Sequence, residues 1–341
     1  MPHALGVETM NPLVSVVVST YNQGWCIEQT LSSVLDQTYQ PMEIIVVDDA
    51  STDDTSSRLQ AFTGRITSLR HQINQGQKTG GGGASRNTGI RQARGEFVAF
   101  LDGDDLWERE KIAVQVQAAL AYPQSGLIAV DGIRFDHHDG RVLQHTLFGE
   151  LGTTLSDGAV WTSRLYDRLL QGCLIDTPSQ VMVPARVFNA VGLFDGGIAS
   201  DYDFYIRVAA EYDITLVKQS LTRYRYHASS VSGPLDRQHF TFAPINVGIW
   251  AKHAKSAREA YRPVIRQRMR QQMRSIADEA FHEGCRRNRK WASQYLCRLL
   301  ATRLSFEWSP YIVVRLARLW CPLWIARIIK PFVRLVFPHK P

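Results

Sequence analysis

Residues 13–22 read LVSVVVSTYN, and residues 42–49 read MEIIVVDD. Each stretch begins with an apolar run of strand length, rich in β-branched residues, and ends in polar side chains. Between the two stretches, apolar residues recur at the spacing of one helical face; they are Ile27, Leu31, Val34 and Leu35. The pattern predicts a strand–helix–strand unit, and the near-continuous apolar strands indicate a parallel sheet that is buried on both faces.

The alternation of strands and helices continues beyond this unit. Residues 51–54, STDD, have the pattern of a helix cap with a carboxylate three residues on, so a helix should start there. We expect a weaker strand at 66–70, a helix at 84–94 and a strand at 97–101. The glycine run 80–83 before that helix is open to two interpretations, a close approach of backbone to phosphate or a mobile loop. This order of elements predicts an α/β fold with a doubly wound, mostly parallel sheet.

The pattern after the fourth expected strand is shorter and less regular. Residues 126–142 contain apolar pieces around a turn at Asp139-Gly140, which fits a hairpin or an extension of the sheet. We expect helices near 187–191 and over 203–211, and a final strand at 215–217.

Length and charge divide the chain into two parts. Its 341 residues exceed what one compact core usually holds, so we expect a main domain over 1–235 and a helical appendage over 236–341. From residue 251 onward there are 20 Lys and Arg against 5 Asp and Glu, whereas the first 250 residues hold 19 against 27. An acidic main domain does not suit a nucleic-acid partner.

Cysteine usage and hydropathy exclude other classes of protein. The five cysteines form no CxxC pair and have no histidine at ligand spacing, so a zinc module and a disulfide framework are both disfavoured. No apolar leader follows a charged N-terminus, and no uncharged run reaches the roughly 18 residues of a membrane span. We therefore expect a cytoplasmic protein.

Polar side chains follow the expected strands where ligands bind in an open parallel sheet. These residues are Thr20, Tyr21, Asn22, Asp48, Asp49, Asp102, Asp104 and Asp105. Five aspartates at one edge would repel one another unless a cation lay among them. Asp102 and Asp104, on either side of Gly103, offer oxygen ligands for a hard divalent cation such as Mg²⁺ or Mn²⁺. Taken alone, the same residues could equally form a helix cap or a solvated turn.

Four blocks of sequence, in this order and spacing, resemble the family 2 glycosyltransferases with the GT-A fold; they are residues 14–22, 43–53, 84–89 and 95–105. The resemblance covers roughly residues 12–232. It implies transfer of a sugar, with inversion at the anomeric carbon, from a nucleotide-diphosphate donor, a UDP-sugar first among them. The acceptor would be a saccharide or a lipid-linked molecule used in surface polysaccharide or glycolipid assembly.

The resemblance also implies roles for single residues. Those it assigns to the donor pocket are Thr20, Tyr21, Asn22, Asp49 and Arg86, with Asp49 on the base. Asp102 and Asp104 match the DxD motif, which binds the donor, and its later aspartate reaches Mg²⁺ or Mn²⁺ on the diphosphate.

A second group of residues matches the family less closely. Asp201 corresponds to the catalytic base, although Ser200 stands where the family usually has Glu, and Asp203 is the nearest rival. Arg225 and His227 fall in a segment that resembles the family's Tyr-Arg-x-His, which often meets the donor phosphates or the metal. Without the resemblance, Asp201 could simply cap a helix and His227 could be structural.

The basic C-terminal region has three interpretations, of which binding to nucleic acid is the least favoured. Trp308, Trp320 and Trp324 are interleaved with arginines, as in segments that lie on an anionic membrane surface. We expect peripheral contact with the inner face of the cell membrane, which would suit a lipid-linked acceptor. Packing within the protein, with a solvated basic face, is the alternative.

Two other functions fit parts of the sequence. A non-catalytic module that binds nucleotide-sugars or docks on membranes would share the fold, but would not need an intact Asp201. A sugar nucleotidyltransferase usually carries a Gly-rich basic loop directly after the first strand, where this chain has Thr20-Tyr21-Asn22-Gln23.

Overall fold

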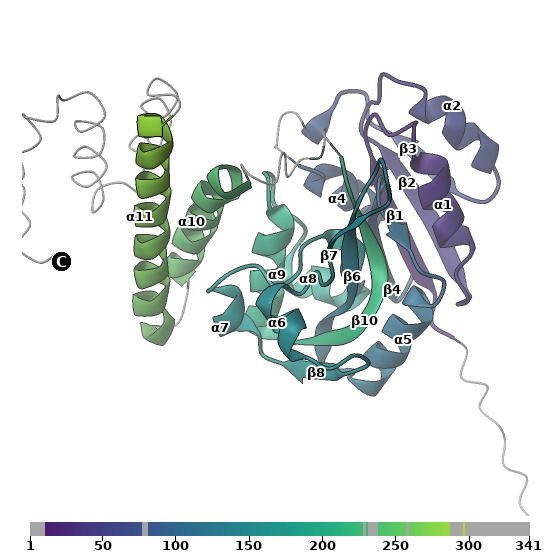
Figure 1. Ribbon diagram of the computed structural model, residues 1–341. Helices are drawn as coiled ribbons and strands as arrows, with labels where there is room; N and C mark the ends of the chain where they lie inside the picture. Colours follow the sequence, from purple (N-terminus) through teal and green to yellow (C-terminus); the bar gives the residue numbers. More distant parts are fainter. Residues whose placement is uncertain are drawn as a thin grey trace, which may run out of the picture. The chain divides into compact units, whose positions relative to one another are not determined.

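The computed structural model describes residues 11–76, 81–227, 230, 238–256, 259–286 and 296. The chain forms two compact units, with the boundary between Val231 and Ser232. The first unit combines a sheet with helices, and the described part of the second unit is helical (Figure 1).

The strands of the first unit are β1 (Val14–Thr20), β2 (Met42–Asp48), β3 (Thr67–Arg70), β4 (Phe97–Asp102), β5 (Leu106–Trp107), β6 (Ser125–Asp136), β7 (Val142–Gln144), β8 (Val160–Ser163), β9 (Val181–Pro184) and β10 (Asp213–Tyr226). Its α-helices are α1 (Ile27–Leu35), α2 (Thr55–Leu59), α4 (Gly83–Gln92), α5 (Lys111–Ala121), α6 (Gly149–Thr154), α7 (Tyr166–Leu169), α8 (Ala185–Val191) and α9 (Ser200–Glu211). Short 3₁₀ turns are η1 (Gln60–Phe62) and η2 (Pro178–Gln180).

Within the described residues, the strands form one sheet in the order β3-β2-β1-β4-β9-β6-β10-β5, with β7 beside β6 and β8 beside β10. The first four strands in this order are parallel to one another, and β6 is parallel to β10. β9 runs antiparallel to both of its neighbours, β4 and β6. The predicted α/β fold with a mostly parallel sheet is confirmed, and β9 joins its two parallel parts.

Both faces of β1 are covered, as its sequence predicts. Every residue of β1 is buried. Val14, Val16 and Val18 belong to the same apolar core as the inner face of α1. Val17 points to the other face, where a Cβ added to Gly89 of α4 would lie only 2.3 Å from its Cγ1. Helices therefore pack on both sides of the sheet, and α4 approaches β1 closely because residue 89 has no side chain.

Two elements near the sheet differ from the sequence prediction. The helix expected at residue 51 begins at Thr55. Ser51 Oγ binds another segment, accepting from Asn22 N at 2.9 Å, whereas Asp53 accepts from Thr55 N at 3.0 Å and from Gly24 N at 3.0 Å. The final strand does not stop at residue 217. A bulge shifts its register between Val217 and Ser220, and β10 then continues beside β6 to Tyr226.

The described part of the second unit contains α10 (Gln238–Ser256), η4 (Glu259–Tyr261) and α11 (Arg262–Arg286), and α10 packs against α11. On α11, Ile265, Met273 and Ile276 are buried, whereas Arg266 and Arg270 are exposed, as the helical spacing predicts. None of the described helices is long and apolar enough to span a bilayer. The tryptophan-rich segment from Trp308 to Lys330 lies outside the described residues.

The close contact between α4 and β1 can be tested with a matched pair of glycine variants. Gly89→Ala is expected to destabilise the protein by about 1–3 kcal/mol, because the new methyl overlaps the fully buried Val17. Gly172→Ala is the control, since nothing lies within 4 Å of the added Cβ. Denaturant unfolding measures both, and equal stability of the two variants would contradict the packing described.

Candidate active site at the carboxyl end of the sheet

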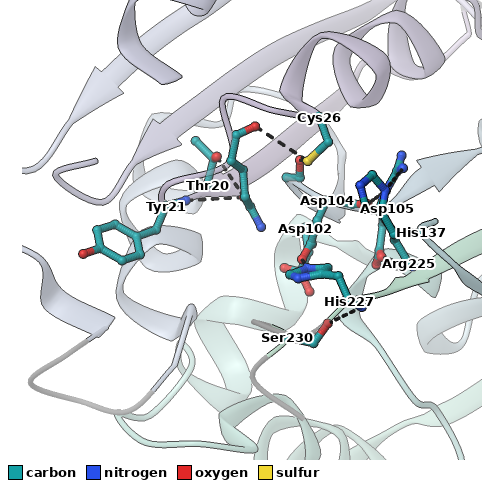
Figure 2. A network of polar contacts seen from close by, with 12 residues as sticks. Thr20, Tyr21, Cys26, Asp102, Asp104, Asp105, His137, Arg225, His227 and Ser230 are labelled. Atoms are coloured by element: carbon teal, nitrogen blue, oxygen red, sulfur yellow. Dashed lines mark hydrogen bonds and ion pairs between the residues drawn. The ribbon is translucent and has the colours of Figure 1, made fainter. Parts of the chain in front are cut away.

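The strands β1, β2 and β4 end together, as the sequence predicts. Thr20 is paired with Asp48 across β1 and β2, and Ser19 is paired with Asp102 across β1 and β4. The turn that follows β4 carries two further carboxylates, Asp104 and Asp105, and Figure 2 shows them beside Asp102. We call residues 102–105 the acidic turn, and the site is built around it.

Each of the five aspartates at this edge has a partner within the protein. Four of the carboxylates meet a basic side chain; the pairs are Asp48 with Arg70, Asp49 with His71, Asp102 with Arg86, and Asp104 with His227. The fifth, Asp105, accepts hydrogen bonds instead. The protein's own donors thus offset the repulsion expected from the sequence, and this repulsion alone does not require a bound cation.

Asp105 is fully buried and joins three segments of the chain. Its Oδ2 accepts from Ser179 Oγ at 2.6 Å and from Thr177 Oγ1 at 3.3 Å, and its Oδ1 accepts from the Arg225 backbone N–H at 2.9 Å. Burial raises its pKa well above the usual range, and the charges of Asp104 and Asp102 raise it further. Asp105 is therefore a structural anchor that holds β10 and the segment before β9 against the acidic turn.

Asp102 is held by the guanidinium of Arg86. Arg86 Nη2 lies 2.5 Å from Asp102 Oδ1, and the Ser19 hydroxyl donates to the same oxygen at 3.1 Å. The guanidinium is nine-tenths buried, its carbon lies 5.8 Å from the centre of the Phe194 ring, and a Cβ on Gly82 would be 3.2 Å from it. Among the described residues, its Nε has no hydrogen-bond partner. Arg86 therefore has donor capacity left on the side away from Asp102.

The glycine run before α4 brings this helix close to the start of α9. A Cβ on Gly81 would lie 2.8 Å from the Gly197 carbonyl, and a Cβ on Gly83 would lie 2.9 Å from both the Asp195 carbonyl and Ser200 Oγ. For Gly81 and Gly83, close backbone packing is thus a third explanation beside the two expected from the sequence. Gly80 lies outside the described residues.

Asp104 and His227 are the pair that best fits a divalent cation. Asp104 Oδ2 lies 2.9 Å from His227 Nε2, and both side chains are largely buried. Two neighbouring ligands of an octahedral ion, each about 2.1 Å from the metal, are about 3.0 Å apart. No group of three or more His, Cys, Asp and Glu side chains arranged for a metal occurs among the described residues. The donor set therefore fits an ion that takes its remaining ligands from phosphate and water, as Mg²⁺ commonly does.

The loop after β1 packs directly on the acidic turn. Thr20 Oγ1 donates to Gln23 Oε1 at 2.8 Å, and a Cβ on Gly103 would lie 2.4 Å from that same oxygen, so the middle position of the turn needs glycine. Cys26 Sγ donates to the Gly103 carbonyl at 3.5 Å. Burial, followed by the charge of Asp104, raises the pKa of Cys26 to about 12, so this thiol stays protonated and is no nucleophile.

The other residues expected in the donor pocket have separate partners. Asn22 Oδ1 accepts from Thr52 N at 2.7 Å, which ties the loop after β1 to the loop after β2. Asp49 accepts from Gly76 N at 2.7 Å and pairs with His71 Nδ1 at 2.6 Å. In Figure 2 the Tyr21 ring points away from the aspartates. The three residues lie at the same end of the sheet, but no contact joins them to Asp102 or Asp104 in the described structure.

Arg225 uses its side chain to hold the acidic turn. Its Nε donates to the Asp104 carbonyl at 2.6 Å, and its Nη2 donates to Gln29 Oε1 at 3.0 Å. Its Nη1 lies 3.3 Å from His137 Nδ1, and its guanidinium lies 5.6 Å from the ring of Trp25. With its donors engaged in this way, Arg225 can act on a bound anion through its charge.

The structure separates the two candidates for a catalytic base on α9. Asp203 is buried, and its Oδ2 lies 3.0 Å from Arg207 Nε. Asp201 is only partly buried, and its Oδ1 accepts from the neighbouring Tyr202 N at 2.8 Å. The surrounding protein desolvates Asp201 and raises its pKa, and the nearby positive charge of Arg86 opposes this rise. Asp201 is therefore the less buried of the two carboxylates.

Several residues of the site do not follow from the sequence patterns. Arg70 is the last residue of β3 and His71 follows it, so both could have been found from the rule that ligands bind at the carboxyl ends of parallel strands. Thr177 and Ser179 precede an antiparallel strand, β9, where that rule does not apply. Trp25 and His137 pack edge to face, with ring centres 4.4 Å apart, and their sequence spacing gives no sign of it.

The chain is similar in sequence to known glycosyltransferases. The family model "Glycosyl transferase family 2" matches residues 15–192, more than half of the chain. TuaG of Bacillus subtilis, named for a glycosyltransferase of teichuronic acid biosynthesis, is 37% identical over 131 residues, 37% of this chain and 51% of TuaG. WfgD of Escherichia coli, a β-1,3-glucosyltransferase acting from UDP-Glc on GlcNAc-diphosphoundecaprenol, is 38% identical over 109 residues, 32% of this chain and 41% of WfgD. The matches thus span about half of these relatives or less.

Two solved structures share the fold at low sequence identity. TarS of S. aureus, solved with UDP-GlcNAc, superposes with a TM-score of 0.56 at 19% identity, over 90% of this chain and 80% of that chain. A mannosyltransferase of Pyrobaculum calidifontis, solved with GDP-Man and Mn²⁺, also gives a TM-score of 0.56 at 19% identity, over 97% of this chain and 89% of that chain. The fold is that of the GT-A glycosyltransferases. With its acidic turn after β4, its α/β sheet and the match over residues 15–192, the chain belongs to glycosyl transferase family 2.

Proposed function

We propose that the protein is an inverting glycosyltransferase that moves a sugar from a nucleotide-diphosphate donor to an acceptor hydroxyl. The observation that carries the proposal is the link made by Arg86, which binds Asp102 of the acidic turn and whose charge opposes the rise that burial causes in the pKa of Asp201 on α9. A site for the leaving diphosphate and a base for the acceptor would then lie on either side of one guanidinium. Family membership and the named activities of the relatives support the same reaction class.

The donor would lie along the ends of β1, β2 and β4. Thr20, Tyr21, Asn22 and Asp49 would border the nucleoside, with Arg86 and Asp102 closer to the phosphates. Asp104 and His227, with Asp102 beside them, would hold Mg²⁺ or Mn²⁺. When bound, such an ion neutralises charge on the diphosphate and so makes it a better leaving group. The positive charge of Arg225 would add to this stabilisation from behind the turn.

The acceptor would be activated from the α9 side of the site. Asp201 accepts the proton of the acceptor hydroxyl as that oxygen forms a bond to the anomeric carbon. The bond between this carbon and the diphosphate oxygen breaks in the same step, and the diphosphate leaves with the bonding electron pair. One displacement from the opposite face inverts the anomeric configuration. A base with a raised pKa suits this step, because proton transfer is most efficient when the pKa lies near the working pH.

The biological setting is proposed from the relatives. TuaG is named for teichuronic acid biosynthesis, and WfgD for glucose transfer to a diphosphoundecaprenol-linked acceptor. We infer a saccharide or lipid-linked acceptor for this chain, met at the inner face of the membrane. The basic, tryptophan-rich end of region 236–341 would then contact the anionic lipid surface.

The role of Asp201 can be tested against its neighbour on the same helix. Asp201→Asn is expected to lower kcat by about 10²–10⁴-fold, the usual contribution of a positioned base, with donor affinity unchanged. Asp203→Asn should mainly lower thermal stability, since it breaks the contact with Arg207. Steady-state kinetics, calorimetric donor binding and thermal unfolding measure the three effects. A large loss of kcat in the Asp203 variant alone would assign the base to Asp203.

The pH dependence should reveal the charge of Arg86. Because Asp201 must be ionised to accept a proton, kcat/KM should fall as the pH drops through its raised pKa. Arg86→Gln removes a positive charge that lowers this pKa, so the acidic limb of the profile should move to higher pH. The profile is recorded at saturating Mn²⁺ for both proteins. An acidic limb that stays in place, or moves to lower pH, would count against coupling between Arg86 and the base.

Metal dependence gives a separate test. Chelation with EDTA should abolish transfer, and added Mn²⁺ should restore it. Asp104→Ala should lower kcat by about 10²-fold or more, the typical loss when one electrostatic stabiliser is removed. Asp54→Asn is the control, because its carboxylate pairs with Arg58 on the surface. Full activity after chelation would refute metal dependence, and donor binding without any turnover would instead indicate a non-catalytic binding module.

A further inference from the structure

A group of polar side chains gathers on one face of the sheet beyond the acidic turn. Arg134 of β6 is paired with Gln144 of β7 on one side and with Tyr224 of β10 on the other. Residues that face each other across neighbouring strands project to the same side of a sheet, so the three side chains lie together. The Arg134 guanidinium lies 4.9 Å from the centre of the Tyr224 ring. Arg225, one residue further along β10, projects to the opposite face, toward Gln29 and Trp25.

Asp176 completes this group from the segment before β9. Its Oδ2 accepts from Gln144 Nε2 at 3.1 Å and lies 3.5 Å from Arg134 Nη2. Its backbone N–H donates to Gln180 Oε1 at 2.9 Å, which fixes the position of the carboxylate. Both charged side chains keep some contact with solvent, with 12% of Arg134 and 22% of Asp176 exposed. The pair is therefore preformed and still open to a ligand.

The group retains unused hydrogen-bonding capacity. Arg134 Nε is buried and has no hydrogen-bond partner among the described residues. The 3.5 Å separation from Asp176 is long for a charge-assisted hydrogen bond. A buried donor left in this state costs free energy unless a ligand or water satisfies it.

The position of the group relates it to the reacting centre. Thr177, the next residue after Asp176, lies with its Oγ1 3.5 Å from Asp102 Oδ2. Burial raises the pKa of Asp176, and the negative charges of Asp131 and Asp201 also raise it, while Arg134 and Gln144 oppose the rise. Asp176 is thus close to the acidic turn and within electrostatic range of the proposed base. A sugar attached to a diphosphate at the acidic turn, with its anomeric carbon facing Asp201, would therefore lie next to both Asp176 and Asp201.

We propose that Arg134, Gln144 and Asp176 bind the hydroxyl groups of the transferred sugar and select a neutral hexose over a uronic acid. Arg134 donates to sugar oxygens and Asp176 accepts from sugar hydroxyls. The Gln144 amide oxygen also accepts, because its Nε2 already donates to the Thr146 carbonyl at 2.6 Å and to Asp176 at 3.1 Å. A uronate carboxylate would place another negative charge near Asp176, Asp201 and Asp102, where Arg134 and Arg86 are already paired with carboxylates. This inference rests on the proposed donor site.

The experiment compares nucleotide with nucleotide-sugar in the full-length protein. Calorimetry with Mn²⁺ first finds which of UDP and GDP binds, and which of its neutral hexose conjugates binds most tightly. Asp176→Asn and Arg134→Gln should each lower the affinity for that hexose conjugate at least about fivefold. The affinity for the free nucleotide should stay within about twofold of that of the unmodified protein. Arg223→Gln is the matched control, because Arg223 lies on β10 next to Tyr224 but packs on Phe135, at 4.9 Å from its ring. It should change neither affinity.

A second measurement uses the unmodified protein, so it does not depend on the folding of any variant. The uronate of the same sugar configuration should bind at least about tenfold more weakly than the hexose conjugate. Equal affinity for the hexose and uronate conjugates would contradict the proposed subsite. So would an equal loss of affinity for the nucleotide and the nucleotide-sugar in both variants. If no nucleoside diphosphate binds the unmodified protein, the proposed function itself fails and the subsite with it.

Discussion

The acidic turn at the end of β4 is the constraint on which the rest of the site depends. It places Asp102, Asp104 and Asp105 within four residues, and such a cluster is stable only if donors surround it. These donors come from positions far apart in the chain: Arg86 on α4, Ser179 before β9, and the Arg225 backbone with His227 at the end of β10. The need to neutralise one turn therefore fixes where three other segments of the chain can lie.

The main features of this arrangement follow from sequence patterns. Apolar strands that end in aspartates predict a parallel sheet with its polar residues along one edge, and the register of β1, β2 and β4 confirms it. The patterns fail where the chain leaves this regularity. The bulge after Val217 interrupts the apolar pattern of β10, so the part of β10 that carries Arg225 was missed. Asp176 and Ser179 precede the antiparallel strand β9, so the rule that ligands bind at the carboxyl ends of parallel strands does not point to them.

Glycine serves packing at this site, at three separate places. Gly89 lets α4 lie on Val17 of β1, Gly83 lets the start of α4 meet Ser200 of α9, and Gly103 lets the acidic turn lie against Gln23. For the run 80–83, which contains Gly83, the sequence suggests freedom of movement or room for phosphate. In the structure, the three glycines allow backbones to approach one another, which brings the acidic turn, Arg86 and the start of α9 into one compact site. Sequence alone cannot choose between these roles, because the choice depends on which atoms face the missing side chain.

The two aspartates of α9 illustrate how charge partners divide roles between similar residues. Asp203 shares its charge with Arg207, which also donates to the backbone carbonyl of Leu193, so this carboxylate holds the loop before α9 in place. Asp201 accepts a hydrogen bond from Tyr202 N and feels the charge of Arg86, whose guanidinium is already hydrogen-bonded to Asp102. A carboxylate with a close cation is a poor proton acceptor, since the cation stabilises its ionised form. The partner geometry, which no spacing in the sequence reveals, therefore distinguishes the two carboxylates and supports Asp201 as the proposed base.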